Sequence, residues 1–188
     1  MKILFITPYI TIDEIASFSK NQTGFGYMVR DIAESVAKNE IVDLITFSSI
    51  NDSFVYNGIN ILKHKWKDFF LNFKVKYFFA SCAYLKKYPV PIKEKLIVLY
   101  YFVSVGYIET LLKKGYYDIV HIHGCGTITE AVMKCCNDCH APFVITFHGL
   151  NSFSDSIKLV MSGKKYEKDF LLKSYIENIP VTFISSGL

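Results

Sequence analysis

Arginine is nearly absent from this 188-residue chain, and its scarcity weighs against one large class of functions. Arg30 is the single arginine, and lysine supplies the rest of the 21 basic residues. The formal net charge of +4 is mild, and the sequence contains no known nucleic-acid-binding motif. Proteins that bind nucleic acids concentrate their basic residues on one face or within such a motif. The sequence therefore gives poor support for a nucleic-acid partner.

Long hydrophobic runs are also missing. The short apolar stretch at residues 2–6 is followed directly by Thr7-Pro8-Tyr9, without the longer apolar core and cleavage site of an export signal. We therefore expect a cytoplasmic protein. The longest apolar run, residues 96–108, is shorter than the roughly 20 residues that a spanning helix needs, and it predicts a buried or half-buried helix.

The dinucleotide-binding glycine fingerprint is incomplete. Thr23-Gly24-Phe25-Gly26 opens a predicted helix, but Val29 occupies the position of the third glycine. No acidic residue follows shortly after the second predicted strand, residues 41–47. Both departures weaken a nicotinamide or flavin dehydrogenase. Glycines at a helix start can still let the backbone approach a ligand, and the unpaired amides there suit a phosphate, although such glycines usually only form a turn.

The chain has five cysteines, an odd number, and no export signal, which favours reduced thiols. Cys136-Asn-Asp-Cys139-His140 matches the haem-attachment pattern, and Cys135 stands beside it. Haem attachment requires an exported chain, and zinc would need a complete set of four ligands. We favour small apolar side chains that pack a helix end, and we expect no metal.

Strands that alternate with helices define the predicted fold. The runs at residues 119–122 and 143–147 are short and nearly continuously hydrophobic, which is typical of parallel strands buried on both faces. Further strands are predicted at residues 2–6, 41–47 and 181–184, with a hairpin around Asn57-Gly58. Helices are predicted at residues 67–85, 93–114 and 164–175. Six strands in this alternation predict an α/β domain with a Rossmann-like, doubly wound parallel sheet and helices on both faces.

A histidine and a glycine follow each of two neighbouring strands. His123-Gly124 ends the strand at 119–122, and His148-Gly149 ends the strand at 143–147. Ligands of such sheets bind in the crevice outside the carboxyl ends of the strands. We therefore expect both pairs in that crevice. Strand parity places His121 on the same face as His123, where it is predicted to be a core histidine with a hydrogen bond.

The order of the motifs resembles the amino-terminal half of the retaining glycosyltransferases of family 4. The resemblance covers nearly the whole chain and is weakest between residues 51 and 112, and the segments that carry it are MKILFITPY, TGFGYMVRDIAESVA, VDLITFSS, YDIVHIHG, APFVITFHGLN and VTFISSGL. That family has the GT-B architecture, in which two Rossmann-like domains face a cleft. The resemblance implies transfer of a sugar from a nucleotide-diphosphate sugar to a saccharide or lipid-linked acceptor, in cell-surface polysaccharide or glycolipid synthesis.

The resemblance also implies roles for individual residues. His148 matches a histidine near the reacting sugar and is the predicted catalytic residue, and His123 matches a histidine on the acceptor side. Gly124, Gly149 and Asn151 adjoin these histidines and are assigned to the substrate site. The donor-phosphate loop corresponds to Thr23, Gly24 and Gly26, with Thr23 in place of the family's first glycine.

The family needs no divalent metal or other cofactor, since the leaving diphosphate is stabilised electrostatically. In agreement, the chain has no Asp-x-Asp motif of the kind that metal-dependent GT-A enzymes use. Residues 1–188 are interpreted as a single acceptor-side domain, and the family's donor-binding carboxyl-terminal domain, with its pair of glutamates spaced eight apart, is absent from this chain. We expect the isolated domain to be inactive, because a half-cleft open to water cannot orient two substrates.

A second interpretation is a non-catalytic module that docks on a membrane or on a partner protein. Nine lysines and many aromatic residues occur between residues 60 and 95, against only Asp68 and Glu94. Lysines beside aromatic rings can bind the anionic inner face of a membrane, although they are more often a solvated surface over an aromatic core. Peripheral membrane contact is compatible with either function.

Overall fold

Short β-branched and aromatic runs form the strands, and longer segments with apolar residues at helical spacing form the helices. The computed structural model describes residues 1–15, 18–19, 23–47, 50, 52–149 and 161–184. Its strands are β1 (Lys2–Thr7), β2 (Ile41–Thr46), β3 (Phe54–Tyr56), β4 (Ile59–Ile61), β5 (Ile119–His123), β6 (Phe143–Phe147) and β7 (Val181–Phe183). Its helices are α1 (Gly24–Ala37), α2 (Trp66–Leu71), α3 (Val75–Lys87), α4 (Ile92–Gly115), α5 (Thr127–Cys139) and α6 (Met161–Ile176).

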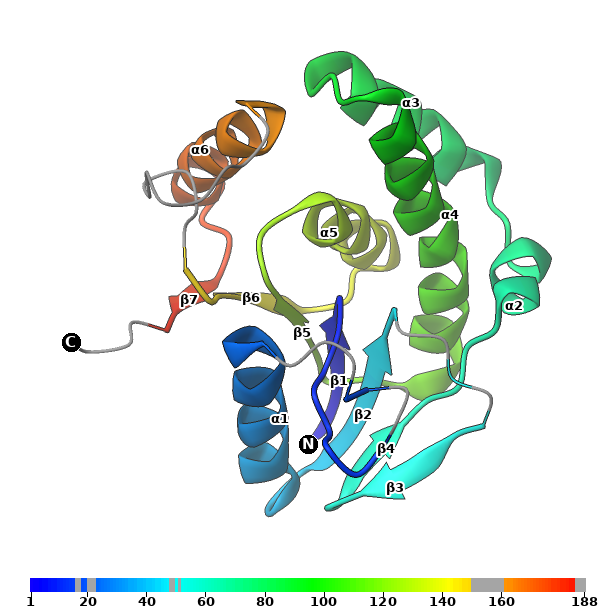
Figure 1. Ribbon diagram of the computed structural model, residues 1–188, viewed down its shortest axis with the longest axis vertical. Coiled ribbons are helices and arrows are strands. Elements are labelled where there is room, and N and C mark those ends of the chain that lie inside the picture. Colours follow the sequence, from blue (N-terminus) through cyan, green and yellow to red (C-terminus); the bar gives the residue numbers. More distant parts are fainter. Residues whose placement is uncertain (16–17, 20–22, 48–49, 51, 150–160, 185–188) are drawn as a thin grey trace.

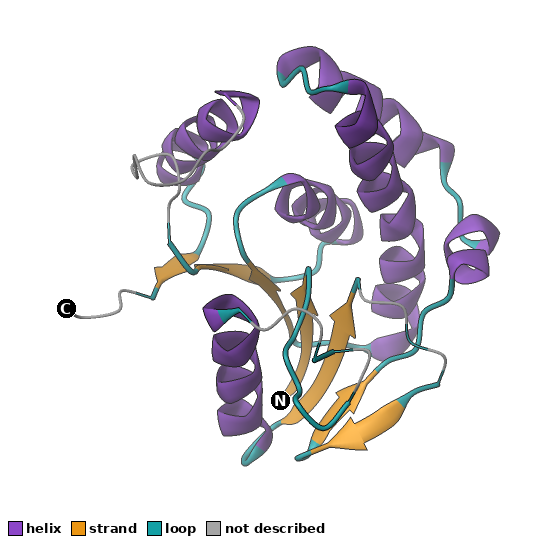
Figure 2. Ribbon diagram, in the orientation of Figure 1, coloured by secondary structure: helices purple, strands orange, loops and turns teal. Residues whose placement is uncertain are grey.

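The strands form one sheet in the order β3-β4-β2-β1-β5-β6-β7 (Figures 1 and 2). All neighbouring strands are parallel except β3 and β4, which form an antiparallel hairpin. Asn57 and Gly58 both have positive φ at the hairpin turn, as a tight two-residue turn requires. The doubly wound fold is thus confirmed, with seven strands instead of six because the hairpin contributes two.

The direction of sheet growth reverses between β1 and β5. From β1 the chain adds β2 and then β4 on one side, and from β5 it adds β6 and β7 on the other side. Helix α1 and the loop residues Ile10, Ile12 and Phe18 cover one face of the sheet. The opposite face is covered by α3, α4, α5 and α6. The reversal creates a crevice at the carboxyl ends of β1 and β5, the usual ligand position in this fold.

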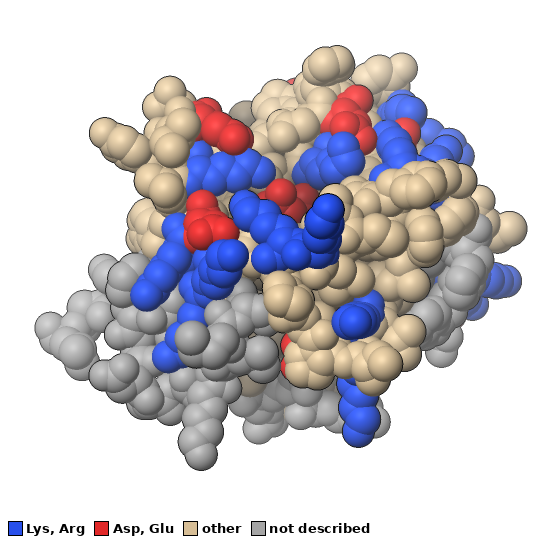
Figure 3. Space-filling model, turned by 90° about the horizontal axis from the view of Figure 1, so that it is seen from above, with Lys and Arg blue, Asp and Glu red and all other residues tan. Residues whose placement is uncertain are grey.

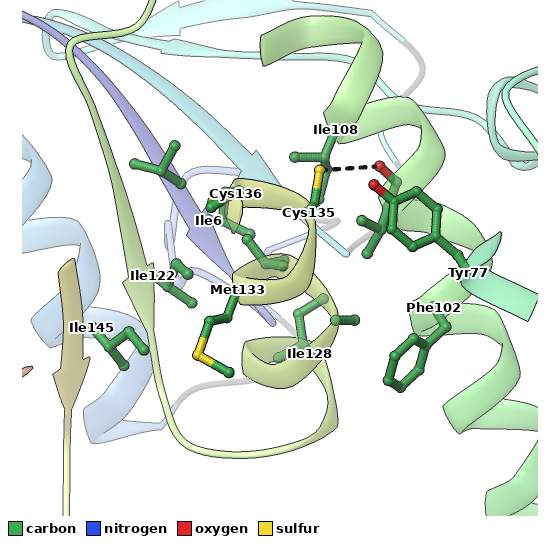
Figure 4. Close-up of a cluster of buried hydrophobic side chains, with 14 of the residues drawn as sticks. Ile6, Tyr77, Phe102, Ile108, Ile122, Ile128, Met133, Cys135, Cys136 and Ile145 are labelled. Carbon is green, nitrogen blue, oxygen red and sulfur yellow. Dashed lines mark hydrogen bonds between the residues drawn. The ribbon is translucent and has the colours of Figure 1, made fainter. Parts of the chain in front are cut away.

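Helix α5 packs between the sheet and the outer helices. Figure 4 shows Met133 and Cys136 of α5 beside Ile122 of the sheet, with Phe102 of α4 on the opposite side. Cys135 and Cys136 are fully buried in this cluster. Burial raises the pKa of both thiols, that of Cys136 to about 12.

The cysteine pair therefore serves as small apolar side chains in the core. His140 ends α5 as its left-handed cap, with a φ of 53°. In the part of the chain that the structure describes, no three histidine, cysteine or acidic side chains are grouped to hold a metal ion.

Helix α4 confirms the helix predicted at residues 93–114 and extends beyond the apolar run at residues 96–108. It has 24 residues, and by length and composition alone it could cross a membrane, the one helix among the described residues that passes this test. However, Val98, Phe102, Val105 and Ile108 are buried against the rest of the domain. A helix of the domain core packs in this way, so we interpret α4 as part of the helical layer that covers the sheet and not as a membrane-spanning helix.

The helix predicted at residues 67–85 is divided in two, which corrects the sequence interpretation. Asn72 lies at the break, where its side-chain amide donates to the Asp68 carbonyl and its amide oxygen accepts from Thr110 of α4. A Cβ on Gly106 of α4 would lie 2.0 Å from the Asn72 carbonyl oxygen. The break therefore follows from a close backbone contact between segments that are far apart in sequence.

Buried Glu109 joins the helices of this face. Its carboxylate accepts hydrogen bonds from Tyr77 and Lys76 of α3 and from Lys113 of α4, at 2.8, 2.9 and 2.6 Å. Lys76 also pairs with Asp138 of α5 at 3.0 Å. Burial raises the pKa of Glu109, but the hydrogen bonds from these three residues outweigh it and lower the pKa to about 2.

We expect Glu109→Gln to lower the free energy of unfolding by about 1–3 kcal/mol, because the two ammonium groups and the Tyr77 hydroxyl lose a charged acceptor. Urea unfolding followed by circular dichroism at pH 7 measures the change. The matched control is Glu177→Gln, which removes an exposed carboxylate after the end of α6 and should change stability by less than about 0.5 kcal/mol. Equal effects of the two substitutions would contradict a structural role for the Glu109 network.

Candidate functional site

A pocket of about 310 Å³ opens at the carboxyl ends of β1, β5 and β6. It lies at the crevice where sheet growth reverses. Its lining comes from the segments after these strands, from the start of α1 and from α6, and consists of Pro8, Tyr9, Phe25, Gly124, Cys125, His148, Gly149 and Glu167. Five segments that are distant in sequence thus meet in one place.

His123 and His148 form a direct hydrogen bond. His123 Nδ1 and His148 Nε2 are 2.9 Å apart, and the two ring centroids are 5.2 Å apart. His123 is fully buried and stacks on Phe5 at 5.1 Å. His148 lines the pocket and packs against Phe25 of α1, with a centroid distance of 4.5 Å. The structure therefore brings His148 and the start of α1 to the pocket, and His123 is buried in hydrogen-bond contact with His148.

The partners of this pair indicate which ring nitrogens carry protons. His148 Nδ1 lies 3.3 Å from Met28 Sδ, and a thioether sulfur can only accept a hydrogen bond. His148 Nδ1 therefore carries the proton in the neutral ring, and its bare Nε2 accepts from His123 Nδ1. His123 Nε2 is then a bare acceptor, and it is buried without a partner among the described residues.

Burial keeps these histidines neutral. It lowers the pKa of His148 to about 4, and together with the neighbouring rings it lowers the pKa of His123 well below its usual value. A neutral imidazole at this position offers one N–H donor, the His148 Nδ1–H that now faces Met28. It can donate to a ligand oxygen if the ligand takes the place of the sulfur.

His121 lies deeper in β5 and on the same face as His123, as predicted. Their ring centroids are 4.1 Å apart, and His121 Nε2 is 2.6 Å from the Thr146 hydroxyl of β6. The Thr146 hydroxyl in turn lies 2.6 Å from the Thr182 hydroxyl of β7. His121 is thus held by a polar row across three strands, and burial lowers its pKa to about 4.

Gly124 and Gly149 adopt conformations that favour glycine. Their φ angles are 99° and 124°, in the region that side-chain-bearing residues rarely occupy. The Gly124 amide donates to the Thr146 carbonyl, and its own carbonyl accepts from Thr129 of α5. These glycines turn the chain sharply after β5 and β6, and both line the pocket. Asn151, the other residue assigned to the substrate site, lies outside the described residues.

The residues of the predicted phosphate loop differ in how accessible they are to a ligand. Thr23 caps α1, and its hydroxyl accepts from the Gly26 amide at 3.2 Å, so this amide is already engaged. Gly26 is buried, and a Cβ there would lie 2.1 Å from Thr11 Oγ1. Gly24, by contrast, has open space around it. The structure therefore gives Gly26 a packing role and leaves Gly24 as the accessible one of the two glycines.

No known family model matches the chain, and no curated protein matches its sequence. Its chemistry must be inferred from its own geometry.

Sequence reasoning missed Glu167 and Cys125 of the pocket lining. Glu167 is buried on α6, and Cys125 follows Gly124 in the loop after β5. Burial raises the pKa of the Cys125 thiol, so it is a neutral wall residue at pH 7. The Glu167 carboxylate can accept hydrogen bonds from ligand hydroxyl groups. The sequence around Glu167 is rich in lysine and resembles a solvated helix, so only the packing of α6 reveals its position.

Because several histidines are buried, we expect the folded domain to lose stability in mild acid. Four histidines, His64, His121, His123 and His148, have pKa values lowered by burial. Below about pH 6.5 the unfolded chain binds protons at these rings. In the folded chain the pKa of His64, His121 and His148 is about 4, and that of His123 is well below its usual value, so these rings stay neutral in mild acid. The free energy of unfolding should therefore fall as the pH decreases from 6.5, by at most about 1.4 kcal/mol per pH unit for each histidine.

Urea midpoints at pH 7, 6 and 5 test this dependence. His123→Gln should reduce the slope by removing one contributor. Ile145→Val is the control, since it trims the core of β6 without removing a titratable group and should keep the full slope. Equal stability of the unmodified chain at pH 5 and pH 7 would show that these rings are not held neutral by the fold.

Proposed function

We propose that the chain is the acceptor-binding half of a retaining glycosyltransferase that uses a nucleotide-diphosphate sugar. The observation that carries this proposal is the hydrogen-bonded pair of His123 and His148 at a pocket that also contains the start of α1. Glu167 adds a buried carboxylate to the same pocket. A neutral donor, a carboxylate and aromatic walls are suited to the hydroxyl groups and faces of a sugar.

In this proposal His148 donates its Nδ1–H to an oxygen of the reacting sugar, and His123 holds the ring in the required tautomer. Glu167 accepts from acceptor hydroxyl groups. The first-turn amides of α1 around Gly24 face the negative charge of the leaving diphosphate, where the helix dipole favours an anion. A bond forms between the anomeric carbon and the acceptor oxygen, the bond to the diphosphate breaks, and the acceptor proton passes to the diphosphate.

Transfer needs a second domain that binds the nucleotide and closes the cleft. Residues 1–188 alone provide only one wall of such a cleft, so they should bind a saccharide acceptor but turn over negligibly. The product is proposed to be a cell-surface polysaccharide or glycolipid.

The test uses the longest natural polypeptide that carries this chain, incubated with a panel of nucleotide-diphosphate sugars and saccharide acceptors. We expect transfer with retention of the anomeric configuration, measured by proton NMR of the product. His148→Ala should lower kcat/KM by about 10²- to 10³-fold, the effect of losing a donor placed where charge develops.

His140→Asn is the matched control for this substitution. His140 is exposed at the end of α5 in a left-handed conformation that asparagine tolerates, and it is not part of the pocket lining. Activity should be unchanged in this variant. Absence of transfer or hydrolysis with every donor, together with no effect of His148→Ala on saccharide binding by residues 1–188, would refute the proposal.

A second candidate function, docking to an anionic membrane, is favoured by one surface observation. Large apolar side chains are exposed on the outer helices, among them Leu71, Val75 and Phe79 of α2 and α3 and Ile92 and Leu96 of α4, with 59–80% of their surface accessible. Lysines occur along the same helices. This combination supports peripheral binding, in which apolar side chains enter the interface and lysines contact anionic head groups. Docking is compatible with sugar transfer to a lipid-linked acceptor.

Cosedimentation with vesicles tests this second function. We expect binding to vesicles that contain phosphatidylglycerol, loss of binding at about 0.5 M salt, and weak binding to phosphatidylcholine alone. The double variant Phe79→Ser/Leu96→Ser should weaken binding about tenfold or more, because two exposed apolar anchors are removed. Tyr175→Ser removes an even more exposed aromatic residue from α6 and should have no effect. Retention of full binding by the double variant would exclude these helices as the docking surface.

A further inference from the structure

A second cavity lies away from the strand ends, between α3, α4, α5 and α6. Its volume is about 330 Å³, within the usual range for small-molecule sites. The aromatic rings of Tyr84, Tyr88, Phe102, Tyr166 and Phe170 form its floor, with centroids of neighbouring rings 5.0–5.7 Å apart. Two small residues of α3 complete the lining on that side, Ala80 and Ala83. We call this cavity the aromatic cleft.

The tyrosine hydroxyls of the cleft are already engaged. Tyr88 donates to Asp169 at 2.9 Å, Tyr166 donates to Glu130 at 3.4 Å, and Tyr84 accepts from Thr127 at 3.1 Å. These bonds fix the ring positions and give each hydroxyl at least one partner within the protein. What the floor offers to a ligand is therefore mainly ring carbon, which suits an apolar chain.

Lysines stand at the rim of the aromatic cleft. Lys87, Lys134 and Lys173 line it together with Glu130 and Asp169, and each ammonium group lies 3.3–3.6 Å from a carboxylate. Figure 3, which looks at the molecule from above, shows lysines gathered on this face with acidic side chains between them. Ion pairs of such partly exposed side chains contribute little to stability, so the ammonium groups can turn toward an anionic ligand. A phosphate group suits such lysines.

The aromatic cleft adjoins a hollow along α6. The two share Lys87, Asp169 and Lys173, and the hollow continues past Leu172 and Ile176. The histidine pocket is a separate cavity, whose residue Glu167 follows Tyr166 on the same helix.

We propose that the aromatic cleft binds an isoprenoid or alkyl chain that carries a diphosphate, with the chain on the aromatic floor and the diphosphate at the rim lysines. As the lipid end of the acceptor, this ligand rests on the proposed function, and it selects a lipid-linked acceptor over a free saccharide. Binding in the cleft itself requires no sugar transfer, so it can be measured separately.

Isothermal titration of the chain with geranyl diphosphate tests the proposal, with geraniol and inorganic diphosphate as the comparison ligands. We expect geranyl diphosphate to bind at least tenfold more tightly than either fragment, since only it contacts both floor and rim. Equal affinity for inorganic diphosphate would reduce the site to a group of surface lysines and overturn the proposal. Equal affinity for geraniol, or no binding of geranyl diphosphate, would overturn it as well.

Two pairs of variants locate the binding. Ala83→Trp fills the cleft from α3 and should abolish binding, whereas Cys82→Trp, at an exposed neighbouring position outside the lining, should not. Lys87→Ala should weaken binding by about five- to tenfold, as expected for one charge-assisted contact, whereas Lys86→Ala should not. Circular dichroism verifies folding of each variant, and the lysine pair keeps the test decisive if a tryptophan variant misfolds. If the two variants of each pair changed the affinity equally, the ligand would bind outside the aromatic cleft, and the proposal would be overturned.

The outcomes also separate this inference from the proposed function. Tight binding of geranyl diphosphate without any sugar transfer would retain the aromatic cleft and overturn the transferase proposal. Transfer to a water-soluble saccharide without binding of geranyl diphosphate would retain the transferase and overturn the lipid site.

Discussion

The parallel sheet has to be covered on both faces, and this requirement organises the rest of the molecule. Because parallel strands all run in the same direction, the carboxyl ends of β1, β5 and β6 lie side by side at one end of the sheet, where the pocket is found. Helix α1 covers one face and the α3–α6 layer covers the other. The carboxyl ends of the strands lie between these two layers of helices. Polar side chains can therefore gather there without disturbing the core.

The histidine pair shows how this position changes the chemistry of its residues. His123 is fully buried beside Phe5, and His148 is partly covered by Phe25. In water the two rings would titrate near pH 6.5, but here burial keeps them neutral. Their shared hydrogen bond and the Met28 sulfur then select one tautomer. A donor with a fixed direction results, which is what recognition of a sugar oxygen requires.

The helices α3–α6, on the face of the sheet opposite α1, are held together by both apolar contacts and ion pairs. Glu109 joins α3 and α4 and, through Lys76, reaches Asp138 of α5. These contacts hold the α3–α4 hairpin against α5, and α6 packs beside it through Tyr166 and Phe170. The aromatic cleft between these helices and the exposed apolar side chains outside them belong to the same layer. A lipid-linked acceptor at a membrane surface would use both.

The sequence alone determined the strands, the doubly wound class and the place of His123 and His148, because β-branched runs and strand ends are local patterns whose geometry is repeated in every parallel sheet. It also identified the turn at Asn57-Gly58, since positive φ is a local requirement. Only the tertiary structure decided the helix break at Asn72, the packing of Gly26 on Thr11 and the place of Glu167 in the pocket. Each of these depends on contact between segments that are separate in sequence, and such contacts are set by how whole helices pack.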